Sequence, residues 1–91
     1  MARELNKIYR IRKDIKKPGG SKEALYWIAG SWSKRSAKLY QLPELKQALR
    51  LMILNRQIYK DTETIEFTVE EFEVTDTKLT YSPNYILENK L

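Results

Sequence analysis

The stretch PELKQALRLMILNRQIYK, residues 43–60, carries the one long helical pattern in the chain and decides the expected fold. Pro43 suits the first turn of a helix, because its missing N–H needs no partner there. Glu44 follows it and complements the positive end of the helix dipole. The interior consists mostly of good helix formers. We therefore expect one long helix here, with strands or loops before and after it.

At about 100° per residue, the apolar side chains of this stretch fall into two stripes. The first stripe would face the core and consists of Leu45, Ala48, Leu49, Met52 and Ile53. The second lies roughly opposite, flanked by two arginines, and comprises Leu51, Leu54 and Ile58 with Arg50 and Arg56. A helix on one sheet buries one stripe. The second stripe is therefore covered by the C-terminal tail, or is an interaction surface, or indicates that the helix ends near Asn55.

Strands are expected on both sides of this helix. Residues 5–13 alternate in period two, with Tyr9 and Ile11 on one side and arginines on the other. Residues 14–23 contain Pro-Gly-Gly, which predicts the tip of a hairpin. The aromatic and β-branched residues of 24–29 favour a second strand. Residues 33–41 fit either a short strand or a short helix capped by a serine.

After the helix, residues 64–74 alternate between apolar and polar side chains, but the phase slips by one residue part-way along. A β-bulge at Glu70 and Glu71 would restore the register. We expect one long, bent strand, with Glu66, Glu70, Glu71 and Glu73 on a solvated face.

The chain of 91 residues is expected to form one domain, with residues 1–4 loose and residues 81–91 as a C-terminal tail. The tail is apolar enough to dock on the helix. The expected fold class is α+β: a small antiparallel sheet of three or four strands, with one long helix packed on one face.

Composition excludes several kinds of function. The chain has no cysteine and no histidine, so thiolate chemistry and the commonest general base and metal ligand are absent. We expect no enzyme activity, no catalytic or metal-binding residues, no cofactor and no small-molecule substrate. No run approaches the 18 or more apolar residues of a membrane span. A cytoplasmic protein without a membrane partner is therefore expected.

Charge is distributed unevenly along the chain. Residues 1–50 hold 13 Lys and Arg against 4 Asp and Glu, whereas residues 51–91 hold 4 against 8, so balances of +9 and −4 sum to the net charge of +5. The two halves can neutralise each other across one sheet. Alternatively, the basic half offers a face for nucleic acid or for an acidic protein surface.

Aromatic side chains lie between basic ones in the first half of the chain, a pattern found in single-strand nucleic-acid binders. Aromatic residues at strand spacing also form core or cross-strand pairs, so both interpretations stay open. The candidate nucleic-acid surface consists of Arg10, Arg12, Tyr26, Trp32, Lys34, Arg35 and Lys38.

The order of features resembles small accessory proteins of Gram-positive phages and prophages. The resemblance spans about residues 7–74, and it rests on Tyr9, Ile11, Arg12, Tyr26, Trp27, Gly30, Trp32, Ser33, Ala37 and Tyr40. Some of these proteins bind and block a host protein. The resemblance therefore implies a non-enzymatic protein that binds a macromolecular partner in the host cytoplasm. A protein partner or self-association is expected first, and nucleic acid is the alternative.

Overall fold

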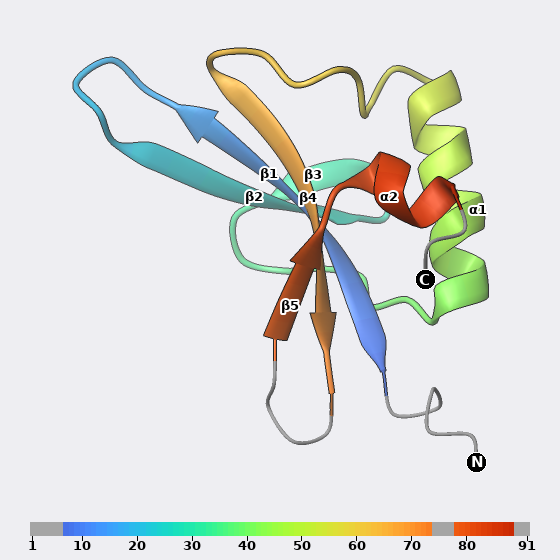
Figure 1. The fold of residues 1–91 in the computed structure, drawn as a ribbon. Coiled ribbons are helices and arrows are strands. Elements are labelled where there is room, and N and C mark those ends of the chain that lie inside the picture. The colour runs from blue at the N-terminus through green and yellow to red at the C-terminus, as the bar shows by residue number, and fades with distance from the viewer. Residues whose placement is uncertain (1–6, 74–77, 89–91) are drawn as a thin grey trace.

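The computed structural model describes residues 7–73 and 78–88. Within these residues the chain forms one five-stranded antiparallel sheet and two helices (Figure 1). The elements are β1 (Ile8–Lys16), β2 (Lys22–Ile28), β3 (Ser31–Ser33), α1 (Leu42–Leu54), β4 (Ile65–Phe72), β5 (Lys78–Tyr81) and α2 (Pro83–Leu87). The strand order is β3-β2-β1-β4-β5, so β1 is central. Residues 1–4, which were expected to be loose, lie outside the described residues.

The predicted fold of three or four strands with one long helix on a face is wrong. The described part of the chain is mostly sheet, and α1 has only 13 residues. Two short edge strands were missed, since three and four residues are too few to show alternation. The β2–β3 hairpin turns at Ala29 and Gly30, which both have positive φ (48° and 87°), as a two-residue type I′ turn requires.

The helix α1 is shorter than expected because the chain reverses at Arg56. This residue has a φ of 63°. Its N–H donates to the carbonyl of Ile53 (3.1 Å), and the N–H of Gln57 donates to the carbonyl of Met52 (2.7 Å). This pair of bonds is the Schellman motif, which closes a helix with a left-handed residue. The helix end near Asn55, one of the three explanations for the second stripe, is therefore observed; it removes Ile58 from the stripe and leaves Leu51 and Leu54 on the helix.

Several strands begin and end at other residues than expected. The strand predicted over residues 5–13 is displaced along the chain, while the hairpin tip at Pro18–Gly20 is confirmed. Residues 34–39 form neither strand nor helix, and Tyr40 makes an isolated bridge to Tyr9. The register of β1 against β4 runs without interruption from Ile8↔Phe72 to Ile15↔Ile65. The predicted β-bulge at Glu70 and Glu71 is therefore absent.

The two faces of the sheet have different environments. Both helices lie on one side of the sheet (Figure 1). There, side chains from β1 and β4 pack against α1 and α2 in a core that comprises Tyr9, Ile11, Tyr40, Leu45, Leu49, Met52, Ile58, Phe67, Val69 and Ile86. We call this the covered face. No helix or strand of the described residues lies over the opposite side, which we call the open face.

Candidate functional site

An apolar ridge remains on the outer side of α1. Leu54 is 75% exposed, Leu51 is 52% exposed and Ile53 is 39% exposed. Arg50 and Arg56 are also exposed beside them. Ile53 was expected in the core, but it is exposed, whereas Leu45, Leu49 and Met52 are buried as predicted. We refer to Leu51, Ile53 and Leu54 as the ridge.

Ile58 does not belong to this ridge, although the sequence pattern placed it there. It lies four residues beyond the end of α1 and is only 4% exposed. The reversal at Arg56 returns Ile58 to the core, where the backbone N–H of Ile58 also donates to the carbonyl of Met52 (3.2 Å). The helical phase that grouped Ile58 with Leu51 and Leu54 therefore does not apply beyond Leu54.

The C-terminal segment docks on the protein but does not cover the ridge. The helix α2 begins at Pro83, and the Ser82 hydroxyl accepts the N–H of Tyr85 (3.2 Å) as an N-cap. Ile86 is fully buried in the core beneath α1. Leu51 and Leu54 stay exposed although α2 is in place. Tail docking therefore stabilises the core and leaves the ridge open.

Two open grooves flank the ridge. One groove, of about 510 Å³, lies between α1 and the β2–β3 hairpin, and its lining residues are Trp27, Gly30, Tyr40, Ala48, Leu51, Met52, Asn55 and Gln57. The other, of about 490 Å³, lies between the end of α1 and the start of α2, and it is lined by Ile53, Ile58, Tyr59, Lys60, Asp61, Phe67, Ser82, Pro83 and Asn84. Leu51 lines the first groove and Ile53 lines the second, so the outer side of α1 lies between the two grooves.

Most of the charged side chains around this surface are basic, and Asp61 in the second groove is the acidic exception among the lining residues. Residues 45–60 contain Lys46, Arg50, Arg56 and Lys60 and no Asp or Glu. Among the described residues, Arg50, Arg56 and Lys60 form no ion pair. Acidic residues stand directly before and after this segment, at Glu44 and Asp61, and Asp61 accepts the backbone N–H of Phe67 (3.2 Å). The rim of the apolar surface is thus mostly basic.

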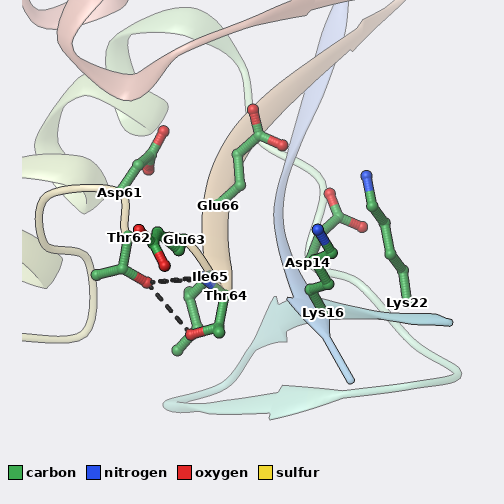
Figure 2. Close-up of a pocket in the computed structure, with 9 residues that line it drawn as sticks. All are labelled: Asp14, Lys16, Lys22, Asp61, Thr62, Glu63, Thr64, Ile65 and Glu66. Carbon is green, nitrogen blue, oxygen red and sulfur yellow. Dashed lines mark hydrogen bonds between the residues drawn. The ribbon is translucent and has the colours of Figure 1, made fainter. Parts of the chain in front are cut away.

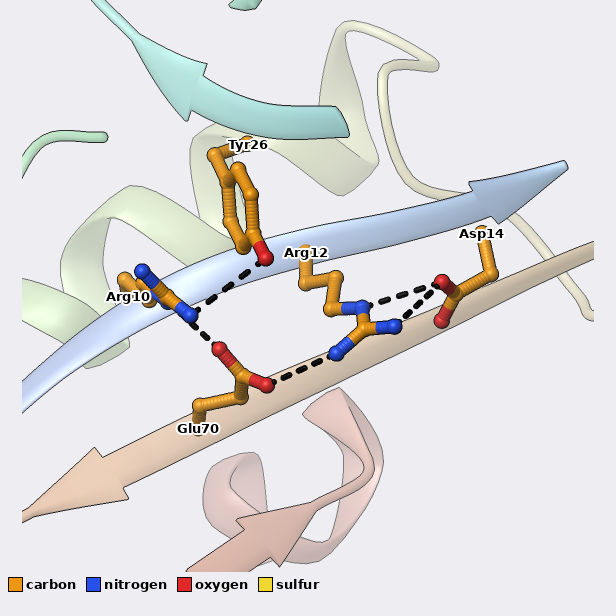
Figure 3. Close-up of polar contacts among 5 residues, drawn as sticks. All are labelled: Arg10, Arg12, Asp14, Tyr26 and Glu70. Atoms are coloured by element: carbon orange, nitrogen blue, oxygen red, sulfur yellow. Dashed lines mark hydrogen bonds and ion pairs between the residues drawn. The ribbon is translucent and has the colours of Figure 1, made fainter. Parts of the chain in front are cut away.

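The open face carries a polar network instead of an apolar surface (Figure 3). Glu70 on β4 is completely buried, and it accepts a hydrogen bond from Arg10 Nε and another from Arg12 Nη1 (3.0 Å). Arg12 also pairs with Asp14 (2.8 Å), and Arg10 lies over the ring of Tyr26 (4.1 Å to the centroid). Burial lowers the pKa of Arg12, but its bonds to Asp14 and Glu70 outweigh that effect and raise it.

The candidate nucleic-acid residues do not form one surface. Arg10, Arg12 and Tyr26 lie together on the open face, but both guanidinium groups already bind carboxylates. Trp32 points to the covered face, where it contacts Trp27 edge-on (5.2 Å between centroids). The remaining members, Lys34, Arg35 and Lys38, follow β3 and are exposed.

Two lysines near Trp32 are engaged by other side chains. Lys34 pairs with Glu23 (2.6 Å), and this bond lowers the pKa of Glu23 and raises that of Lys34. Lys13 lies over the Trp32 ring (4.6 Å to the centroid), and burial lowers its pKa. Nucleic-acid binding stays a prediction.

A polar pocket of about 240 Å³ lies where β4 begins (Figure 2). Its lining comprises Asp14, Lys16, Lys22, Asp61, Thr62, Glu63, Thr64, Ile65 and Glu66. The Thr62 hydroxyl accepts the N–H groups of Thr64 (3.3 Å) and Ile65 (3.0 Å), so this turn caps the free end of the strand. No group of three or more metal-ligating side chains suited to a metal ion occurs in residues 7–73 and 78–88.

Sequence reasoning missed the burial of two glutamates. Glu70 is 0% exposed and Glu71 is 1% exposed, whereas both were expected on a solvated face. Glu71 lies on the covered face and accepts hydroxyl groups from Tyr9 (2.7 Å) and Tyr81 (3.3 Å). The Tyr9 pKa is raised by burial and by this bond to Glu71. The alternation of residues 65–69, carried on without a bulge, would have placed Glu71 beside Phe67 and Val69.

In comparisons with known proteins, no protein-family model, curated protein or solved structure matches the chain. The structure shows no helix, within the ranges it describes, that is both long and apolar enough to cross a membrane.

Proposed function

We propose that this chain is a non-enzymatic binding protein that recognises another protein through the ridge on α1. The observation that carries the proposal is the exposure of Leu51 and Leu54 on adjacent turns of one helix, between two apolar grooves. Single exposed leucines are ordinary, but two neighbouring exposed leucines beside apolar grooves are typical of interaction sites. Fully burying an exposed leucine side chain contributes about 1.5–3 kcal/mol, and the partly buried ridge residues supply a fraction of that each.

Further support comes from the sequence. The chain has neither histidine nor cysteine, which leaves few residues for catalysis. Its resemblance to phage and prophage accessory proteins agrees with action on a host protein in the cytoplasm. Two arginines at the edge of the ridge, Arg50 and Arg56, suit the polar rim of an interface, where arginine is favoured.

The test is a capture experiment with matched variants. Immobilised wild-type protein, Leu54→Glu and Leu39→Glu are exposed to lysate of a Gram-positive bacterium, with and without nuclease. Leu39 is also exposed (53%), but it lines neither groove, so it is the control for an added charge. We expect Leu54→Glu to lose a nuclease-resistant protein band that Leu39→Glu retains. Equal capture by all three proteins would contradict the proposal, and so would loss of the band on nuclease treatment.

A further inference from the structure

We propose that the partner segment is an acidic amphipathic helix of another protein, which lies along α1 and inserts an apolar anchor side chain into the groove between α1 and the β2–β3 hairpin. This inference rests on the proposed function, because it names the chemistry of the partner that the ridge binds. A second copy of this chain differs from this partner in charge, and nucleic acid differs from it because nucleic acid lacks aliphatic side chains.

Charge complementarity points to an acidic partner. The segment from 45 to 60 has four cationic side chains and no anionic one, and Arg50, Arg56 and Lys60 form no ion pair with any described residue. Carboxylates opposite these groups would add attraction and speed the encounter. Because the cations surround an apolar ridge, a partner needs acidic and apolar side chains together. Nucleic acid has no aliphatic side chains for Leu51 and Leu54.

The same charges disfavour a second copy. In a two-fold dimer the same surface meets itself. A dimer through the ridge would bring Arg50 and Arg56 of one copy toward the same residues of the other. Like charges placed opposite each other in an interface are costly. The acidic residues that could offset them lie outside residues 45–60.

The exposed pattern on α1 suits a helical partner. Gln47, Arg50, Leu51 and Leu54 are all exposed, and they lie at i, i+3, i+4 and i+7. This spacing forms one continuous strip along a helix. Two helices pack through such strips at axis distances of about 8–10 Å. A partner helix on this strip has the groove beside Leu51 within reach of its side chains.

The groove beside the strip has the composition of an anchor pocket. Trp27, Tyr40 and Met52 supply apolar walls, and Asn55 and Gln57 supply polar groups at one end. Its volume of about 510 Å³ falls in the range of ligand pockets, which is roughly 300–1,000 Å³. Aromatic and leucine side chains of amphipathic helices enter grooves of this kind.

Backbone strain at Arg56 is an independent observation at the same place. Its φ of 63° lies in the left-handed region, where glycine is favoured at this helix position. Residues that keep an unfavourable backbone conformation are enriched at functional sites. Arg56 is exposed just after the end of α1, and in this proposal its guanidinium group pairs with a carboxylate of the partner.

The experiment uses two synthetic peptides of equal length with identical apolar residues. One is an amphipathic helix with leucine and phenylalanine at i, i+3, i+4 and i+7 and glutamate at the other positions, and its counterpart has lysine in place of each glutamate. Binding is followed by tryptophan fluorescence, since Trp27 lines the groove. We expect the glutamate peptide to bind at least about tenfold more tightly than the lysine peptide. Affinity should fall as salt increases.

Three variants locate the contact. Leu54→Glu should lower the affinity for the glutamate peptide by about tenfold or more, while Leu39→Glu should change this affinity little. Arg56→Gly should raise Tm by removing backbone strain and yet weaken binding severalfold. Circular dichroism verifies that each variant is folded. A merely structural role for Arg56 predicts no change in affinity.

Several outcomes would overturn this inference. They are equal binding of the two peptides, binding of neither, no response to Arg56→Gly, and a wild-type dimer in sedimentation that Leu54→Glu dissociates. If Leu54→Glu still abolishes capture from lysate, the proposed function stands and only the acidic helix is rejected. If Leu54→Glu leaves capture intact, the proposed function itself fails.

Discussion

Each face of the sheet buries one glutamate. The two glutamates, Glu70 and Glu71, are adjacent residues of β4. Glu70 points to the open face, where it binds the guanidinium groups of Arg10 and Arg12. Glu71 points to the covered face, where it binds the hydroxyl groups of Tyr9 and Tyr81. The face without helices thus uses charged partners, whereas the face beneath the helices uses neutral donors.

This difference shows what keeps each face intact. A buried carboxylate is costly unless its oxygens are paired. On the covered face apolar packing supplies most of the stability, and two hydroxyl groups satisfy Glu71. On the open face no described element excludes water, so the arginine side chains themselves cover Glu70. Arg10 does so while held between the rings of Tyr26 and Phe72, at 4.1 and 4.9 Å from their centroids.

The largest effect is expected from Arg10→Ala. This change removes one charged partner of Glu70 and the group that packs between two aromatic rings, so it should cost about 3–5 kcal/mol in the free energy of unfolding. Urea denaturation measures this loss. Lys16→Ala is the control, because Lys16 is exposed on the same strand and face. It should change stability by less than about 0.5 kcal/mol. A loss below about 1 kcal/mol for Arg10→Ala would show that the network does not stabilise the open face.

The next effect concerns the packing of the covered face. Leu49 is completely buried between α1 and the sheet, so Leu49→Ala should cost about 2–4 kcal/mol in a urea melt. Leu51 lies on the same helix but is 52% exposed, and Leu51→Ala should cost much less. Similar losses for the two variants would mean that α1 presents a different side to the core.

The smallest effect is expected from the neutral partners of Glu71. Tyr9→Phe keeps the ring but removes the shorter of two hydrogen bonds, and Tyr81 still donates to Glu71. The expected cost is about 1–3 kcal/mol at neutral pH, measured by urea denaturation. Tyr59→Phe is the control, because the Tyr59 side chain is 45% exposed. An unchanged stability for Tyr9→Phe would indicate that Glu71 does not need this donor.

The same tyrosines predict how the covered face responds to alkali. Burial raises the pKa values of Tyr9, Tyr40 and Tyr81 above the usual 10.0. Above that pH the unfolded chain releases these protons while the folded chain retains them, so stability should be full below pH 10 and fall as pH rises. Thermal melts at increasing pH measure this decline. It should be shallower in Tyr9→Phe, and a parallel decline in both proteins would contradict the assignment.

Local patterns were enough to predict part of this fold and part of the candidate site. The hairpin tip at Pro18–Gly20 follows from residues that favour turns whatever surrounds them. The inner side of α1, with Leu45, Leu49 and Met52, follows from helical periodicity. Helical periodicity also placed Leu51 and Leu54 side by side on the outer side of α1, where both are exposed. It wrongly grouped Ile58 with them, because Ile58 lies beyond the end of the helix and is buried.

The amino-acid sequence by itself determined which segments prefer a helix or a turn, where the basic residues of α1 lie, and that histidine and cysteine take no part. Only the tertiary structure decided how far α1 extends and which carboxylates are buried. The helix end depends on a left-handed arginine, which short-range preferences disfavour. The burial of Glu70 depends on arginines 58 and 60 residues away in the chain. Such distant pairings leave no periodic signal near the glutamate, because they arise only when β1 and β4 pair.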